Sequence, residues 1–281
     1  MTEHSFRGRK VPSPNRIRAP KGMKTIFPKK DETHLAEAVA AFKNASSAAA
    51  LTGAGISVNS GIADFRSPGG VWTVFSPDEY ATLDIFLRMP EKAWQLYRAI
   101  GQSLLGKKPN IAHEVLAELE KSGLLQGLVT QNVDNLHQAA GSENVFEIHG
   151  DHQHLQCLQC GHVTPVSEDH YLMSGVPSCL RCSYPYKPNV VLFGEAVRSL
   201  DSIEELLAGC DLLLVIGTSA NVYPAAGLPA MVKDQGGLVY EFNLEPALSA
   251  GGWGRTRLVD YFFAGDLAET LPLFGRAVMG R

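Results

Sequence analysis

Short apolar runs alternate with helical patterns along most of the chain. The apolar runs lie at 48–51, 124–130, 144–150, 211–219, 237–243 and 259–265. Between them, apolar residues recur three or four positions apart, which predicts helices at 31–44, 90–105, 110–121, 201–208 and 265–273. Continuous apolar strands are typical of a parallel sheet covered on both faces, because neither face of such a strand meets water. The pattern predicts a doubly wound α/β core.

Residues 151–188 interrupt this alternation. The stretch contains four cysteines, scattered polar residues, Pro177 and Pro185, and it has little periodicity. It predicts a small module inserted between strands of the core.

The composition indicates an ordinary globular protein. The 281 residues are 45% hydrophobic and 19% charged, which is enough to bury a large core. No apolar run approaches the roughly 20 residues that span a bilayer, and the N-terminus lacks the apolar core of a secretory signal. We therefore expect a cytoplasmic protein whose thiols are kept reduced.

The charge is distributed unevenly. Residues 1–30 hold nine Lys or Arg and one acid, whereas the remaining 251 residues hold 16 basic and 28 acidic side chains. The basic stretch is rich in proline and poor in large apolar groups, so a flexible tail is predicted there, with the folded domain at 31–281. A nucleic-acid or acidic-partner arm and an organelle transit peptide are alternatives for the tail, the latter implying an organelle matrix. The acidic body gives no support for nucleic-acid binding.

The first strand leads into a glycine-containing turn, residues 51–61 (LTGAGISVNSG). Gly53 and Gly55 would let the backbone approach a phosphate, and a following helix would direct its N–H groups at the anion. The spacing is not GxGxxG, and a purely structural turn is the alternative. The adjacent GIADFR at 61–66 adds an acid, an aromatic ring and a guanidinium that core packing does not require.

Polar side chains follow two later strands. Gln131, Asn132, Asp134 and His137 close one of them, and His149 closes the next. The C-terminal ends of parallel strands line the ligand crevice in such folds, and a neutral imidazole suits proton abstraction near neutral pH. Helix capping by the amide and carboxylate, or a structural or metal-binding histidine, would explain the same residues differently.

The cysteines form two CxxC pairs eighteen residues apart: Cys157, Cys160, Cys179 and Cys182. Four thiolates match a closed tetrahedral structural zinc site, which has no ligand position left to activate water. A redox CxxC would be expected once, at a helix start beside a strand. The spacing therefore predicts structural zinc, while the single remaining cysteine, Cys210, is expected to be a buried filler.

Taken in order, these motifs resemble the sirtuin family of NAD-dependent protein deacylases. The resemblance extends from about Leu35 to Leu273, and it is carried by GAGIS, GIADFR, TQNVDNLH, EIHG, the CxxC pairs, KPNVVLFGE, GTS and VYPAA. It implies a Rossmann-type NAD domain joined to a small zinc module at about 151–188. NAD and the acylated lysine would meet between them.

The resemblance also implies roles for individual residues. The phosphates and the adjacent ribose would contact Gly53, Ala54, Gly55 and Ser57. The cofactor loop around the nicotinamide would contain Asp64, Phe65 and Arg66. The nicotinamide and its ribose would be held by Gln131, Asn132 and Asp134, and the adenosine half by Gly217, Thr218, Ser219, Asn243 and Asp266. An extended peptide would pair with Val191, Leu192, Phe193, Gly194 and Glu195, and Tyr97 would lie on the acyl side.

The implied activity is an NAD-dependent lysine deacylase, most simply a deacetylase, that consumes NAD and releases nicotinamide and O-acyl-ADP-ribose. His149 would act as general base on a ribose hydroxyl, with Asn132 and Asp134 in the catalytic pocket. The substrate partner would be an acylated protein, with no membrane and no direct nucleic-acid partner expected. An ADP-ribosyltransferase or NAD hydrolase using the same pocket, and a non-enzymatic NAD sensor, are the alternatives.

Three positions depart from the family pattern. Ala63 replaces the usual proline of GIPDFR, and Ala220 replaces a commoner leucine after GTS. Relatives that prefer succinyl or malonyl groups carry an arginine three residues after the tyrosine that corresponds to Tyr97, where this chain has Ile100. The apolar side chain predicts a preference for acetyl or longer apolar acyl groups.

Overall fold

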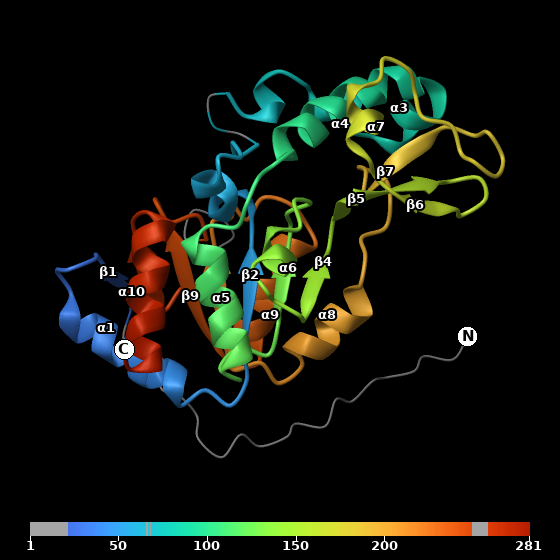
Figure 1. Cartoon of the computed structure of the whole chain (residues 1–281). Coiled ribbons are helices and arrows are strands. Elements are labelled where there is room, and N and C mark those ends of the chain that lie inside the picture. Colours follow the sequence, from blue (N-terminus) through green and yellow to red (C-terminus); the bar gives the residue numbers. More distant parts are fainter. Residues whose placement is uncertain (1–21, 66, 68, 249–257) are drawn as a thin grey trace, which may run out of the picture.

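The computed structural model describes residues 22–65, 67, 69–248 and 258–281. Figure 1 shows a larger α/β body with a smaller domain above it. The larger body carries the chain ends of the described region, and the smaller domain is entered and left through loops at one end of the large sheet.

The large sheet has seven strands, and every neighbouring pair is parallel. Their order across the sheet is β1 (Lys24–Ile26), β10 (Tyr261–Ala264), β9 (Leu238–Asn243), β8 (Leu212–Ile216), β2 (Ala48–Thr52), β3 (Leu128–Thr130) and β4 (Val145–Glu147). The chain runs outward from β2 to β4 and then returns to β8 on the other side of β2. Ligands of open α/β sheets bind at such a reversal, outside the carboxyl ends of the strands.

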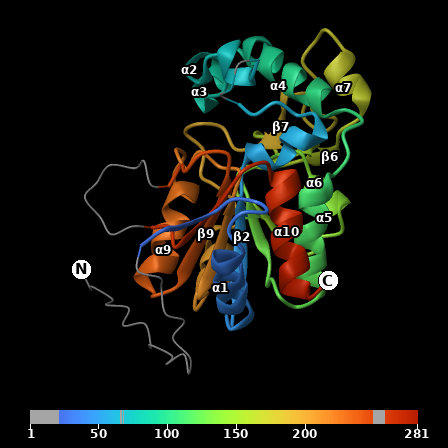
Figure 2. The same cartoon turned by 90° about the vertical axis from the view of Figure 1, so that its left-hand side faces the viewer.

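Helices cover both faces of this sheet, as Figure 2 shows. One face packs against α1 (Glu32–Lys43), α5 (Ile111–Lys121) and α10 (Leu267–Met279). The other face packs against α8 (Leu200–Leu207) and α9 (Leu228–Asp234). Because β2 and β8 are buried along their whole length, their continuous apolar sequences are explained, and the predicted doubly wound core is confirmed.

The smaller domain combines two distant chain segments. The first supplies α2 (Pro77–Tyr80), α3 (Leu83–Arg88) and α4 (Pro90–Leu104). The second supplies α7 (Glu168–Leu172) and an antiparallel sheet ordered β6 (Val163–Pro165), β5 (Gly150–Cys157) and β7 (Tyr186–Val190). The indole N–H of Trp94 donates to the carbonyl of Tyr186 at 2.7 Å, and both side chains are buried.

Two details differ from the sequence predictions. Residues 24–26, inside the predicted 1–30 tail, form strand β1 and pair with β10, because the apolar Ile26 is buried against the core; residues 1–21 lie outside the described residues. The turn after β2 leads into a short 3₁₀ helix, η1 (Ala54–Ser60). Gly61, in the left-handed conformation, ends this helix after seven residues. The short helices η2 (Val71–Thr73), α6 (Leu136–Ala139) and η3 (Ala225–Gly227) complete the described elements.

Candidate active site

The glycine turn packs backbone against backbone at the reversal point of the sheet. The amide of Gly55 donates to the carbonyl of Gly217 at 2.8 Å, joining the β2 loop to the β8 loop. A Cβ atom added to Gly53 or Gly55 would lie within 2.9 Å of Gly217 or Thr218. The glycines are therefore required by this close approach, and the two loops together form one concave surface outside the strand ends.

Asn132 links the polar groups next to this turn through hydrogen bonds. Its side-chain amide donates to the carbonyl of Gly53 at 3.3 Å and to the hydroxyl of Ser57 at 3.2 Å. The hydroxyl of Ser57 donates in turn to Asp134 at 2.6 Å. Burial raises the pKa of Asp134, and the hydrogen bonds from Ser57 and the backbone of Leu136 oppose that shift. The structure thus brings together residues that are 77 positions apart in sequence.

His149 lies in the two-residue connection between β4 and β5, and its tautomer is fixed by a neighbouring backbone. Nδ1 lies 3.0 Å from the carbonyl of Gln131, so this nitrogen must carry the proton and donate. Nε2 is then the basic nitrogen. Burial lowers the pKa of His149, although the bond to Gln131 opposes the shift. The ring is therefore neutral near pH 7, which is the form that can accept a proton.

The segment after η1 closes over an apolar cavity of about 230 Å³. The carboxylate of Asp64 accepts hydrogen bonds from the amide and the hydroxyl of Ser67, at 2.7 and 2.6 Å. The rings of Phe65 and Trp72 pack together with their centroids 5.3 Å apart. Arg66 lies outside the described residues. The cavity wall combines residues of the predicted site with apolar neighbours: Ala54, Ser57, Ala63, Phe65, Ile100, Asn132 and Asp134.

The β8 and β9 ends form the other half of the surface. Thr218 accepts from the side chain of Gln131 at 2.8 Å through its hydroxyl, and from Asn243 at 3.1 Å through its carbonyl. Asp266 begins α10 by accepting from Ala268 and also accepts from Asn59 of η1 at 2.6 Å. Ser219, the last residue of GTS, is exposed. Gly217, Thr218 and Asn243 are therefore joined to the glycine turn, and Asp266 is joined to η1.

The predicted peptide segment, Val191 to Glu195, connects the two domains. The amide of Val191 donates to the carbonyl of His149 at 2.8 Å. Phe193 exchanges backbone hydrogen bonds of 3.0 Å with the 81–83 segment. Leu192 is buried, Phe193 is half exposed, and Gly194 has a φ of 95° that favours glycine. The segment therefore has the base on one side and an extended neighbour on the other.

Tyr97 lies deeper than its predicted role on the acyl side suggests. It is 1% exposed and packs edge-on against Trp94, whereas Ile100, one turn further along α4, lines the cavity. Burial and the carboxylate of Glu195 raise the pKa of its hydroxyl, which has no hydrogen-bond partner in the described part of the chain. The acyl-side prediction therefore rests on Ile100 more directly than on Tyr97.

One residue of this region, Lys187, was not predicted from the sequence. It is fully buried in β7, where its ammonium bonds to Glu195 at 3.0 Å and to the carbonyl of Val190. Burial lowers its pKa, and the ion pair with Glu195 opposes the shift. The lysine lies between aromatic and apolar residues in the stretch YKPNV, which is the available sign that its charge is buried.

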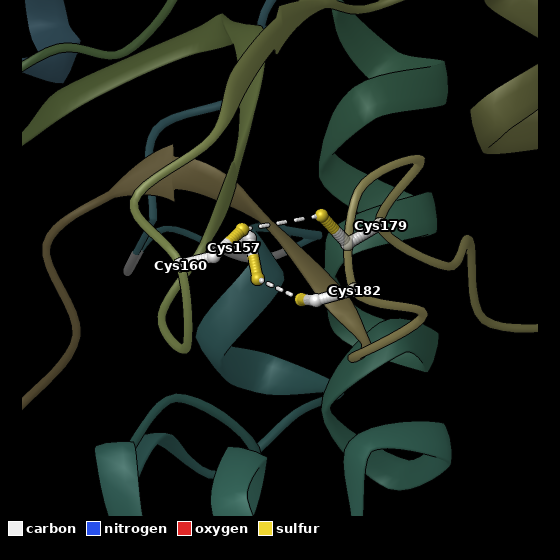
Figure 3. Close-up of side chains that lie close together, drawn as sticks. All are labelled: Cys157, Cys160, Cys179 and Cys182. Carbon is white, nitrogen blue, oxygen red and sulfur yellow. Dashed lines mark hydrogen bonds between the residues drawn. The ribbon is translucent and has the colours of Figure 1, made fainter.

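The four cysteine side chains converge in the small domain, and Figure 3 shows them pointing toward one another. All four sulfurs lie within 4.8 Å of one another, with Cys157 to Cys182 at 3.4 Å and Cys160 to Cys179 at 3.6 Å. Among the described residues this is the one cluster of potential metal ligands. Four thiolates at this separation fit a tetrahedral zinc ion, as the spacing predicts.

Comparison with known proteins decides the family. The sequence model of the Sir2 family matches residues 53–224, which include the glycine turn, Asn132, His149 and all four cysteines of the cluster. The chain belongs to the Sir2 family. This confirms the sirtuin resemblance.

Sir2 relatives match most of the chain. A NAD-dependent protein deacylase of Pyrococcus furiosus is 41% identical over 233 residues, covering 81% of this chain and 91% of the relative. A NAD-dependent protein deacetylase of Sulfurisphaera tokodaii is 44% identical over 200 residues, covering 70% of this chain and 80% of the relative. A solved Sir2 homologue–NAD complex has a TM-score of 0.80 at 35% identity, covering 92% of this chain and 96% of its own.

Proposed function

We propose that this Sir2 protein is an NAD-dependent protein lysine deacylase that releases nicotinamide and O-acyl-ADP-ribose. The observation that carries the proposal is His149, whose Nδ1 proton is held by the carbonyl of Gln131 so that Nε2 is the base. A protein that only senses NAD has no need of a base with a fixed tautomer beside the cofactor surface.

The surrounding residues would serve both the binding of NAD and its reaction. The turn of Gly53 and Gly55 supplies a close backbone approach for the NAD phosphates. Asn132, Ser57 and Asp134 form a polar wall of the adjoining cavity, where the nicotinamide end would be held away from water. His149 would take a proton from a ribose hydroxyl. The chain itself therefore supplies binding, orientation, exclusion of water and a base.

The substrate we propose is an acylated lysine in a protein or peptide. A related Sir2 structure was solved with a deacetylated peptide and 3′-O-acetyl ADP ribose, with a TM-score of 0.76 at 33% identity. In this chain, the backbone of Val191 bonds to His149, and Phe193 pairs with the 81–83 segment before the chain turns at Gly194. Main-chain pairing there would accept varied sequences.

The zinc site would hold the small domain together. Its sulfurs belong to two loops of that domain, and a four-thiolate shell has no open position for a reacting group. No helix in the described parts of the chain is long and apolar enough to cross a membrane. The cytoplasmic location and the absence of nucleic-acid binding remain predictions from the sequence.

Mass spectrometry of the products tests the proposal. The protein is incubated with NAD and a panel of acyl-lysine peptides, and we expect free lysine, nicotinamide and O-acyl-ADP-ribose in equal amounts. Nicotinamide release that does not require an acylated peptide would instead identify an NAD hydrolase. A peptide that gains ADP-ribose would identify an ADP-ribosyltransferase, and unchanged NAD with every peptide would reject an enzymatic role.

A further inference from the structure

A buried chain of hydrogen bonds joins the ends of β2 and β3 beneath the NAD surface. The hydroxyls of Thr52 and Thr130, the last residues of these strands, lie 2.8 Å apart. Nε2 of His137 lies 2.9 Å from the hydroxyl oxygen of Thr52. At the other end, the backbone amide of Asn132 donates to the hydroxyl oxygen of Thr130 at 3.1 Å. All four residues are at most 4% exposed.

A second imidazole, that of His113 in α5, extends this chain away from the site. The backbone amide of Asn110 donates to Nδ1 of His113 at 3.3 Å, so the ring proton of His113 is on Nε2. The rings of His113 and His137 meet edge to face, with centroids 4.9 Å apart. In the described part of the molecule, neither Nε2 of His113 nor Nδ1 of His137 has a hydrogen-bond partner, and both atoms are fully buried.

The tautomer of His137 sets the direction of the whole chain. The hydroxyl of Thr52 donates to Thr130, so its oxygen is the acceptor for His137. His137 can donate to it only with its proton on Nε2. The direction of the chain therefore requires the Nε2–H form of His137.

We propose that His137 is a positioning residue of the NAD site, which holds Thr52 and Thr130 together and thereby fixes the backbone of Asn132. The ring of His113, which packs edge to face against His137, would help to hold that imidazole in place. Thr52 directly precedes Gly53 of the phosphate turn, and the side chain of Asn132 bonds to that same turn. The buried chain of hydrogen bonds would therefore fix the position of the phosphate side of the surface relative to the nicotinamide side. As far as catalysis is concerned, this inference rests on the proposed function.

Two further observations are consistent with this role. Burial lowers the pKa of His113 to about 4 and that of His137 to about 3, so both rings are neutral near pH 7, as the directed chain requires. His137 follows Asp134 by three residues and lies on α6, outside the cavity wall. It would act through Thr52 and Asn132 and would not touch the substrate.

Substitution of Thr52 gives the first test, because valine has the shape of threonine without its hydroxyl. We expect Thr52→Val to lower kcat about 10- to 100-fold, as for a misplacement of about 1 Å at an active site. The KM for the acyl peptide should not change. Thr52→Ser restores the hydroxyl and should recover most of the activity. Thr164→Val in β6 is the control, because it removes a threonine hydroxyl from the small domain, outside the NAD surface.

Nitrogen-15 NMR of the full-length, zinc-loaded protein gives a second test that needs no functional assay. Long-range spectra near pH 7 should show His137 with its proton on Nε2 and a bare Nδ1, and His137→Leu would assign its signals. A proton on Nδ1 of His137 would overturn the proposal. A folded Thr52→Val enzyme with the kcat of the wild type would also overturn it.

Calorimetric titration of NAD separates this inference from the proposed activity. If the wild-type protein deacylates no peptide, the deacylase function fails, but the positioning role still predicts that Thr52→Val weakens NAD binding about 5- to 10-fold, the equivalent of about one hydrogen bond. Equal NAD affinity of the two proteins would then overturn the positioning role by itself.

Discussion

His149 has one hydrogen-bonded nitrogen and one basic nitrogen, and this asymmetry predicts what its removal does. His149→Ala should lower kcat by about 10²- to 10⁴-fold, the usual contribution of a general base. NAD affinity should stay near that of the wild type, because the glycine turn is untouched. Steady-state kinetics and calorimetry measure the two quantities, with His34→Ala in α1 as a histidine control. Activity within a few-fold of wild type would exclude His149 as the base.

Ile100 predicts the choice of acyl group. Its side chain lines the cavity and offers neither a charge nor a hydrogen bond to a carboxylate, so succinyl-lysine would lose hydration without compensation. We expect kcat/KM to be higher for acetyl and longer apolar acyl peptides than for the succinyl peptide. Ile100→Arg should narrow this difference by supplying a guanidinium. Competition among three acylated versions of one peptide measures the preference, and a succinyl preference in the wild type would contradict it.

Individual residues were predictable where they follow a strand, and less so where they are held by contacts from elsewhere. Asn132, Asp134 and His149 could be identified because polar groups at strand ends line the crevice of a parallel sheet. Lys187 could not, because its partner Glu195 is brought to it by the fold of the loop between them. The depth of Tyr97 also depends on packing by the second half of the small domain, which helix spacing does not reveal.

At the scale of elements, the zinc cluster predicts the behaviour of the small domain. Cys157→Ser should release the zinc and destabilise that domain, because the binding free energy of a structural zinc is also folding free energy. Cys210→Ala is the matched control, because Cys210 is buried in the core of the large sheet, outside the cysteine cluster. This variant should retain one zinc per chain. Metal analysis and thermal denaturation test this. A folded, active wild-type protein without zinc would contradict it.

The Val191–Glu195 segment beside His149 gives another element-scale prediction. Gly194 has a φ of 95°, and a Cβ there would meet only Leu83, at an ordinary contact distance of 3.9 Å, so Gly194→Ala adds backbone strain without a clash. Non-glycine residues pay about 1 kcal/mol or more in this region. We expect a several-fold higher KM for the peptide and an unchanged KM for NAD. Gly209→Ala, with a φ of 81° and no close neighbour, applies the same strain elsewhere. Equal effects of both variants on peptide KM would contradict a role for the segment in peptide binding.

Elements with a strong period were predicted well, and short ones were not. The predicted helices at 90–105 and 110–121 correspond to α4 and α5, each shifted by one residue or less at either end. Strand β1 was missed because three residues carry no measurable period and the surrounding stretch is basic and rich in proline. The β5–β7 sheet was missed because β5 mixes cysteine, histidine and glutamine, and because β6 and β7 each contain a proline. Its strands pack against α4 and the cysteine cluster, which the strand sequences do not reveal.

For the whole molecule, buried histidines predict a loss of stability in acid. Burial lowers the pKa of His113 and His152 to about 4 and that of His137 to about 3. Below pH 6.5, the ordinary pKa of histidine, these histidines bind protons in the unfolded chain but not in the folded chain. Each of them therefore lowers the free energy of unfolding by about 2 kcal/mol between pH 6.5 and 5. Burial raises the pKa of Glu147 to about 7, which has the opposite sign. Because this carboxyl is partly exposed and screened by solvent, it raises the free energy of unfolding by only about 1 to 2 kcal/mol as the pH falls from 7 to 5.

The net expectation is a free energy of unfolding about 4 kcal/mol lower at pH 5 than at pH 7. Urea denaturation at both pH values measures it, with zinc content followed to separate metal loss. Glu147→Gln keeps an acceptor for Asn135 and Gln138 but cannot titrate, so the loss of unfolding free energy at pH 5 should grow by about 1 to 2 kcal/mol. Equal stability of the wild type at the two pH values would contradict the histidine argument.

The division of the small domain between two segments also sets the order in which the chain can fold. Trp94 bonds to a carbonyl 92 residues later, and β3 and β4 of the large sheet are synthesised in between. Synthesis proceeds at about 5 to 20 residues per second, so roughly 5 to 18 s pass between the synthesis of α4 and that of its partner strand β7. During that interval the apolar face of α4 has no native cover from β7. Nascent chains of this protein would therefore present a binding site for chaperones that disappears once residue 186 has emerged.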